Sequence, residues 1–256
     1  KPHCHCKRTD RKCEAVVTTV YLVRHAEAEG NVNETFQGRV DTEVTEKGMR
    51  QLDCLAERFR DIPIQVLYAS PLKRTRVTAA AVNRYHQLPV QYLDELMEIN
   101  GGVWEGKPWA DLPRLYPESY RLWQEQMHLF HVQGGESMQQ VFDRMRQAVC
   151  GIAAGHCGKT IAVVSHGCAI RNFLCYAAGE DISHLDQVGW ADNTAVSKVE
   201  FDASGHCRLI FKNDASHLPP KLSTLAKSRW CRHDGKSYLT DQTYTPGIDR
   251  EQEAQA

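Results

Sequence analysis

At residues 20–31 the chain reads Val20-Tyr21-Leu22-Val23-Arg24-His25-Ala26-Glu27-Ala28-Glu29-Gly30-Asn31. The first four residues are β-branched, aliphatic or aromatic, which is the composition of a buried parallel strand. Charged residues follow at its carboxyl end, where open α/β sheets place their ligands. Arg24 carries a planar set of donors suited to phosphate oxygens, and His25 can be a neutral nucleophile near pH 7. The alternative for this stretch alone is a strand that ends in a solvated loop.

A second apolar run, residues 66–69, predicts another short buried strand. Ser70 and Pro71 follow it as the predicted N-cap and first residue of a helix. Arg74 then lies in the first turn of that helix, where a cation opposes the helix dipole. A bound anion would explain this placement, because helix N-termini also attract phosphate. The alternative is an exposed arginine without a role.

A third apolar run, residues 160–164, is followed by Ser165-His166-Gly167 and then by a helix that we expect to end at Gly179. Strands that alternate with helices predict an α/β fold with a mostly parallel sheet. Parallel neighbours would bring the residues after these three strands to one edge of the sheet. Two guanidinium groups can match the charge of a phosphate dianion, and two histidines can provide one nucleophile and one donor.

Other local signals define the ends of elements. Thr45 is a plausible N-cap for a helix with one apolar face, and Ser137 and Gln140 form a capping box. The segments 195–201 and 207–211 predict a hairpin that closes at a Ser-Gly pair.

The segment 104–131 is rich in aromatic residues and stands between two βα units, where a lid can be inserted. Trp104, Trp109 and Trp123 offer apolar area with a polar tip, which suits the wall of a substrate pocket. The alternative is ordinary packing, because several aromatic residues recur at helical spacing. We expect this segment to be part lid and part satellite core, and to set substrate choice.

Composition excludes some partners. The 256 residues fit one large domain or two small ones, and the formal charge of −1 argues against a nucleic-acid partner. No apolar run approaches the ~20 residues that span a bilayer, so we expect no membrane partner. The ten cysteines show no repeated spacing, which favours reduced thiols and a cytoplasmic protein. A homodimer remains open.

Both ends of the chain differ from its middle. Residues 1–16 are predicted to be a disordered or non-native tail, because their His and Cys residues lack the paired spacing of a zinc site. The main domain is expected over residues 17–217. Residues 218–256, with two consecutive prolines and few aliphatic residues, are predicted to be a loosely docked tail.

Four motifs follow one another along the chain. They are Val23-Arg24-His25-Ala26-Glu27, Ser70-Pro71-Leu72-Lys73-Arg74-Thr75-Arg76-Val77-Thr78-Ala79, Glu98 ahead of Gly102-Val103-Trp104-Glu105-Gly106, and Val164-Ser165-His166-Gly167. Together they resemble the histidine phosphatase superfamily, within its phosphoglycerate-mutase-like branch. The resemblance runs from about Thr18 to His217 in the family order. It implies a three-layer sandwich with a mostly parallel central sheet flanked by helices.

The resemblance also implies a role for each motif residue. His25 would be the nucleophile and carry a phosphohistidine, with a nearby backbone carbonyl fixing its tautomer. Arg24, Arg74 and His166 would hold the phosphoryl oxygens, and His166 is expected to be cationic because it would face a dianion. Glu98 would be the general acid to the leaving oxygen and then the base for water.

Two further positions lie where the family contacts phosphate. Asn31 stands at one of them, and Gln37 with Gly38 falls in the next phosphate-side loop. Ala26 departs from the commoner glycine of the Arg-His-Gly signature, and we expect it to be tolerated. The predicted ligands are Arg and His without a carboxylate cluster, so we expect a metal-independent enzyme with no cofactor.

The expected activity is hydrolysis of a small-molecule phosphate monoester. Mutase members carry a longer basic insertion, whereas residues 98–135 are short and aromatic, and their only Lys or Arg residues are Lys107, Arg114 and Arg121. The segment resembles broad-specificity and α-ribazole phosphatases more closely. Two alternatives remain: phosphoryl transfer of the mutase type, and a catalytically weak protein that binds a phosphoester in signalling. A serine-hydrolase elbow is excluded, because Val163 stands where that motif needs glycine.

Overall fold

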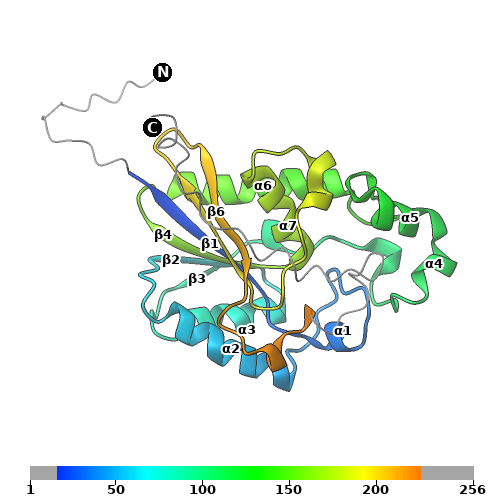
Figure 1. The fold of residues 1–256 in the computed structure, drawn as a ribbon, viewed down its shortest axis with the longest axis horizontal. Helices are drawn as coiled ribbons and strands as arrows, with labels where there is room; N and C mark the ends of the chain where they lie inside the picture. The colour runs from blue at the N-terminus through cyan, green and yellow to red at the C-terminus, as the bar shows by residue number, and fades with distance from the viewer. Residues whose placement is uncertain (1–15, 226–256) are drawn as a thin grey trace, which may run out of the picture.

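The computed structural model describes residues 16–225. Its centre is a six-stranded sheet of order β3-β2-β4-β1-β5-β6 (Figure 1). The four strands β3, β2, β4 and β1 are parallel to one another, whereas β5 pairs antiparallel with β1 and forms an antiparallel hairpin with β6. The prediction of a mostly parallel α/β sheet is confirmed. The strands are β1 (Thr18–Arg24), β2 (Val66–Ala69), β3 (Val90–Tyr92), β4 (Thr160–Ser165), β5 (Val196–Phe201) and β6 (Cys207–Asp214).

Helices cover both faces of the sheet. In Figure 1, α2 and α3 lie below it and α6 and α7 above it, while α4 and α5 extend to one side. The three-layer arrangement that the family resemblance implies is therefore observed. The helices are α1 (Glu29–Val32), α2 (Glu46–Phe59), α3 (Lys73–Val82), α4 (Leu112–Leu115), α5 (Pro117–Glu125), α6 (Met138–Gly155) and α7 (Gly167–Ala177).

Two apolar cores form because side chains of a strand alternate between the faces of a sheet. In β1, Val20 and Leu22 belong to the core under α6 and α7, whereas Val23 belongs to the core that α2 and α3 cover. Phe59 fills the second core and is fully buried. Both faces of the central strands are apolar, as their uninterrupted hydrophobic runs predict.

The predicted caps are mostly confirmed. Thr45 accepts a hydrogen bond from the Gly48 N–H at the start of α2, and Ser137 with Gln140 forms the capping box of α6. The prediction for Ser70 and Pro71 is wrong, because α3 begins later, at Lys73, with Leu72 as its N-cap. The Ser70 hydroxyl instead lies 2.7 Å from a ring nitrogen of His166.

The segment 104–131 packs as a cluster of aromatic rings. Trp104 is fully buried, and its ring centroid lies 5.0 Å from that of Phe130 and 5.9 Å from that of Trp123. Phe36 packs edge-on against Trp104 at 5.4 Å. This cluster is continuous with the core under α6 and α7.

The last described residues form a strap across the start of α2. The Leu222 carbonyl accepts a hydrogen bond from Gln51, and the Thr224 hydroxyl donates to Glu27. Asp192 accepts the N–H groups of both Thr224 and Leu225. We call residues 222–225 the C-terminal strap. Of the predicted tails at residues 1–16 and 218–256, residues 1–15 and 226–256 lie outside the described residues, and the domain limits stay a prediction.

Within residues 16–225 no helix has the length and apolarity that a bilayer crossing requires. The cysteines of this part of the chain are free thiols: Cys54, Cys150, Cys157, Cys168, Cys175 and Cys207.

Candidate active site

The candidate site lies at the carboxyl edge of three adjacent parallel strands, β2, β4 and β1. Arg24 at the end of β1 is in register with Ser165 at the end of β4, and Ala69 of β2 is in register with Val164. The residues that follow these strands therefore meet. This confirms the expectation that His25, Arg74 and His166 gather at one edge.

His25 is held so that one ring nitrogen remains available. Its Nδ1 lies 2.7 Å from the Ala26 carbonyl oxygen, which accepts only if Nδ1 carries the proton. Nε2 is then the unprotonated nitrogen. Burial, followed by the positive charges of Arg74 and Arg24, holds the pKa of His25 well below its usual value, although the Ala26 carbonyl opposes this. His25 is therefore neutral near pH 7, as a nucleophile must be.

The backbone around His25 is fixed by side chains from other elements. Asn193 donates its amide N–H to the His25 carbonyl at 2.9 Å, and the Ala26 N–H donates to the Thr78 hydroxyl at 3.0 Å. Thr78 in turn donates to the Arg74 carbonyl at 2.7 Å. Sequence reasoning missed the roles of Asn193 and Thr78, because their bonds to residues 25 and 26 join segments far apart in the chain. Ala26 is fully buried without disturbing this arrangement.

Arg24 is buried beside the first turn of α7, and its guanidinium donates to the Ala191 carbonyl. A Cβ on Gly167, the first residue of α7, would lie 3.2 Å from Arg24 Nε. Glycine at this position therefore allows the guanidinium to lie close against the helix N-terminus. Arg24 lines the same cavity as His25.

Arg74 is fully buried rather than exposed, which rules out a surface arginine without a role. It donates to the Gly38 carbonyl at 2.7 Å, to the Val40 carbonyl at 2.8 Å and to His166 Nδ1 at 3.2 Å. Burial lowers its pKa to about 10, while Glu98 raises it, so Arg74 stays charged at neutral pH. It thus joins the phosphate-side loop to the sheet edge.

His166 lies next to the Arg74 guanidinium, and its ring centroid is 5.3 Å from that of His25. Because Nδ1 accepts from Arg74, Nε2 carries the proton and donates to Ser70. Burial and then the Arg74 charge hold the pKa of His166 well below its usual value. The expectation of a cationic His166 therefore does not fit this arrangement. His166 is fully buried and is not among the residues that line the cavity.

Asn31, Gln37 and Gly38 line the cavity opposite the strands. The Asn31 side-chain oxygen accepts the Ala28 N–H at 3.0 Å, so its NH₂ group is the part that can donate to an anion. Gln37 accepts from the Thr42 hydroxyl at 2.7 Å. Gly38 has a φ of +49°, and a Cβ there would lie 2.5 Å from Glu105 Oε1, which explains the glycine.

Glu98 reaches the cavity from the chain between β3 and α6. Its Oε2 accepts the Cys168 N–H at 3.0 Å, and its Oε1 accepts the N–H groups of Ala169 at 3.0 Å and Ile99 at 2.9 Å. The carboxylate therefore caps the N-terminus of α7, a favourable place for negative charge. Oε2 accepts one hydrogen bond and Oε1 accepts two, so Oε2 is the oxygen that is more available to carry a proton.

Aromatic side chains form the outer wall of the cavity. Trp109 and Trp123 line it as predicted, and their ring centroids lie 5.6 Å apart. Trp190, which the sequence did not suggest, stacks on Trp123 at 6.0 Å. Trp104 is not among the lining residues, because its ring is fully buried under the wall. We therefore place Trp104 in the core rather than in the pocket.

Among residues 16–225, no group of three or more His, Cys, Asp or Glu side chains is placed to hold a metal ion. The polar side chains of the cavity wall are a different set, with two arginines, a histidine, two amides, one threonine hydroxyl and one carboxylate. Such donors suit phosphate oxygens.

Comparison with known proteins agrees with this site. The family model of the histidine phosphatase superfamily (branch 1) matches residues 20–215. Phosphoserine phosphatase 1 of Hydrogenobacter thermophilus is 35% identical over 181 residues, covering 71% of this chain and 85% of that protein. A metal-independent phosphoserine phosphatase of Arabidopsis thaliana is 34% identical over 166 residues, covering 63% and 69%. The solved structure of Bacillus stearothermophilus YhfR is similar with a TM-score of 0.75 and 30% identity, covering 78% and 98%.

Proposed function

This chain belongs to the histidine phosphatase superfamily (branch 1), and from that premise we propose that it hydrolyses small-molecule phosphate monoesters through a phosphohistidine at His25. The observation that carries the proposal is the tautomer of His25. Its Nδ1 is engaged by the Ala26 carbonyl, so Nε2 is free to attack in a cavity that Arg24 and Arg74 also line. The metal-independent relative from Arabidopsis supports the same chemistry.

In the first step, His25 Nε2 attacks phosphorus and the bond from phosphorus to the ester oxygen breaks. Arg24, Arg74 and the amides of Asn31 and Gln37 stabilise the charge on the phosphoryl oxygens, which is the main requirement of phosphoryl transfer. Protonated Glu98 gives its proton to the leaving oxygen, so that an alcohol departs.

In the second step, water attacks the phosphohistidine. Glu98, now a carboxylate, takes a proton from that water, and inorganic phosphate leaves with His25 neutral again. The same carboxylate thus acts first as acid and then as base. His166 supports the phosphate site through Arg74, whose guanidinium it orients.

Hydrolysis is favoured over mutase chemistry by the basic residues of the inserted segment. Lys107, Arg114 and Arg121 are exposed, and none of them lines the cavity. The last two pair with Asp111 and Glu125 on the surface. A substrate carboxylate would therefore meet the aromatic wall of Trp109, Trp123 and Trp190 and not a cation. We propose that this wall sets the choice of leaving alcohol.

The test is turnover of p-nitrophenyl phosphate in excess EDTA. We expect hydrolysis together with an acid-labile, alkali-stable phosphohistidine, both lost in His25→Ala. Full loss of activity on chelation that Mg²⁺ restores, or a phosphoryl adduct on Ser165 or a cysteine, would contradict the proposal. A binding protein without turnover would give neither product nor adduct.

Two further expectations concern the location of the protein in the cell and its oligomeric state. The cysteines of residues 16–225 are free thiols, which supports a reducing cytoplasmic location, because disulfides are favoured in oxidising compartments. A homodimer is an open alternative to the monomer, and sedimentation of the purified protein distinguishes the two.

A further inference from the structure

Glu98 lies in a stretch of chain without regular structure. Residues 97–101 fall between two short 3₁₀ turns, Asp94–Leu96 and Gly102–Trp104. Backbone groups in such a stretch have no helix or sheet partners, so other groups must satisfy them if they are withdrawn from water. The partners of this backbone therefore decide where the Glu98 side chain lies.

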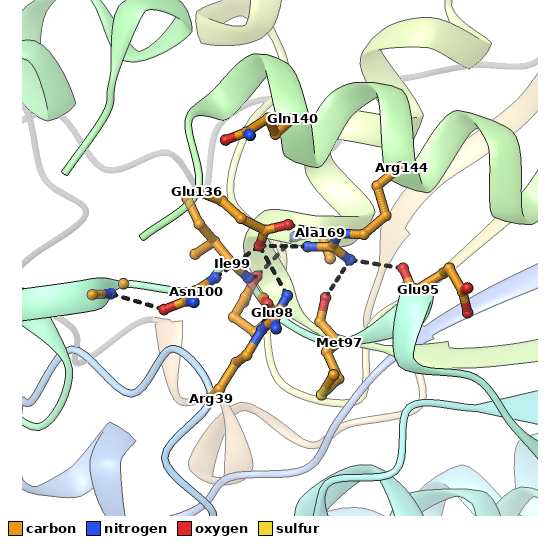
Figure 2. Close-up of polar contacts among 12 residues, drawn as sticks. Arg39, Glu95, Met97, Glu98, Ile99, Asn100, Glu136, Gln140, Arg144 and Ala169 are labelled. Carbon is orange, nitrogen blue, oxygen red and sulfur yellow. Dashed lines mark hydrogen bonds and ion pairs between the residues drawn. The ribbon is translucent and has the colours of Figure 1, made fainter. Parts of the chain in front are cut away.

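Arg144 of α6 holds the chain before Glu98. Its Nη1 donates to the Glu95 carbonyl at 2.7 Å and to the Met97 carbonyl at 2.9 Å (Figure 2). The rest of its guanidinium is bound in a two-bonded pair with Glu136, in which Nε and Nη2 each donate at 2.9 Å. Every part of this planar group is thus used, which fixes its orientation.

Glu136 holds the chain after Glu98. Its Oε2 accepts the Asn100 N–H at 2.8 Å, on the opposite side of Glu98 from the Arg144 contacts (Figure 2). Burial by itself would raise the pKa of Glu136, but the hydrogen bonds from Arg144 and Asn100 outweigh burial and lower it. Glu136 is therefore ionised at neutral pH and paired with Arg144, and both side chains are largely shielded from water, with 17% and 15% of their surface exposed.

Arg39 connects this pair to the phosphate side of the cavity. It follows Gly38, whose carbonyl Arg74 binds, and its Nη2 lies 3.2 Å from Glu136 Oε2. Its Nε also approaches the Glu98 carbonyl at 3.4 Å. We call Arg39, Glu136 and Arg144 the clamp.

We propose that Glu136 and Arg144 are positioning residues that set the place of the Glu98 carboxyl relative to the phosphate, with Arg39 as their link to the phosphate-side loop. The Glu98 carboxyl itself is bound at the N-terminus of α7, and the backbone on either side of Glu98 is bound by Arg144 of α6 and by Glu136 of the turn before α6. The acid is therefore carried by the helical layer, whereas His25 and Arg24 belong to the sheet. This inference rests on the proposed function, because positioning matters only if Glu98 transfers a proton.

The inference predicts a specific kinetic defect. An alkyl phosphate needs a proton on the leaving oxygen, whereas nitrophenolate leaves well without one. A clamp that merely stabilised the fold would affect both substrates alike. Loss of acid positioning should instead slow phosphorylation of His25 by the alkyl ester selectively.

The experiment measures the burst of His25 phosphorylation by rapid quench, with glycerol phosphate and with p-nitrophenyl phosphate. The variants are Glu136→Gln, which keeps the shape but removes the charge, and Arg144→Met. Arg146→Met is the matched control, because Arg146 lies on the same helix in an exposed pair with Asp143. Glu98→Gln gives the full effect of losing the acid.

We expect both clamp variants to slow the glycerol phosphate burst by about tenfold and the p-nitrophenyl phosphate burst by no more than about twofold, a part of the ~10²–10⁴-fold that general acid catalysis supplies. Arg146→Met should change neither. The rate constant of the burst does not depend on how much protein is folded, so partial unfolding does not obscure it. Equal slowing of both substrates, or no slowing in either variant, would overturn the inference. Loss of the burst with glycerol phosphate alone agrees with the inference, because the slowed phosphorylation then limits turnover. A wild-type enzyme that hydrolyses these esters without forming any phosphohistidine at His25 would instead refute the proposed function.

Discussion

At the scale of single residues, the two ring nitrogens of His25 have separate tasks. Nδ1 binds the Ala26 carbonyl and Nε2 faces the cavity, so a backbone group of the next residue decides which nitrogen attacks. The two ring nitrogens of His166 also have different partners, Arg74 on one nitrogen and Ser70 on the other. Each ring is buried and lies near arginine side chains. Burial and the positive charges both disfavour a second proton on the ring.

We therefore expect both rings to stay neutral below the ordinary histidine pKa. Two arginines and full burial lower the pKa of His25, and Arg74 with burial lowers that of His166. An NMR titration of the ring carbons should show both residues without a protonation step between pH 8 and the ordinary value of about 6.5. His25→Asn and His166→Asn assign the two signals. A step at or above the ordinary value for His25 would contradict the nucleophile assignment.

The sequence indicated the candidate site residues but not their hydrogen-bond partners. Arg24, His25, Arg74, Glu98 and Gly167 stood in recognisable motifs. Their supporting hydrogen bonds could not be read from the chain. Ser70 illustrates this, since its position after a strand suggested a cap although its hydroxyl serves His166, a contact across 96 residues. Trp104 was expected in the pocket because tryptophan suits both a wall and a core, and only packing decides between them.

At the scale of elements, the loop before β5 holds the end of β1. Ala191 accepts from Arg24, and Asn193 donates to the carbonyl of His25. Between them, Asp192 accepts three hydrogen bonds from the C-terminal strap, including the Ser223 hydroxyl. Residues 222–225, the described end of a segment predicted to dock loosely, are therefore bound to the loop that holds His25. Low aliphatic content did not reveal this, because the strap is held by polar bonds.

We predict that Thr224→Val destabilises the protein although it keeps the side-chain volume. The hydroxyl donates to Glu27 at 2.8 Å and accepts from Gln51 at 3.0 Å, and both partners are buried. Leaving a buried polar group without its partner costs about 1–3 kcal/mol, so the free energy of unfolding in urea should fall by that amount. Ser204→Ala, in the exposed turn of the β5–β6 hairpin, is the control. Unchanged stability would mean that the strap is loosely docked after all.

At the scale of the whole molecule, the fold follows from hydrophobic pattern and the site from topology. The strands β1, β2 and β4 are apolar runs whose side chains enter the cores on both faces of the sheet, and they lie side by side. The candidate site residues at the ends of these strands then meet at one edge of the sheet. The antiparallel hairpin was also visible in the sequence. What could not be foreseen is how α6 and the strap act on the site from outside it, since those contacts depend on the packed structure.

The same packing makes stability depend on pH. His25, His166 and His217 are all withdrawn from water, and each has a lowered pKa, which for His217 is about 4 because of burial and then the charge of Arg58. His217 joins Arg58 on α2 to the Thr194 hydroxyl, next to the loop that binds His25. Below the unfolded value of about 6.5, the unfolded chain binds more protons than the folded one, so stability falls as the pH falls.

We therefore predict that acidification from pH 7 to pH 5 lowers the free energy of unfolding, with about 2 kcal/mol of the loss due to His217 alone. Urea unfolding at both pH values measures it. His217→Gln should be less stable than wild type at pH 7, because its bonds to Arg58 and Thr194 are weakened, yet it should lose less on acidification. His206→Gln is the control, since an exposed histidine has no such effect. If His217→Gln and wild type lose the same stability between the two pH values, His217 is not the buried neutral group that its contacts indicate, and the acid sensitivity belongs to other residues.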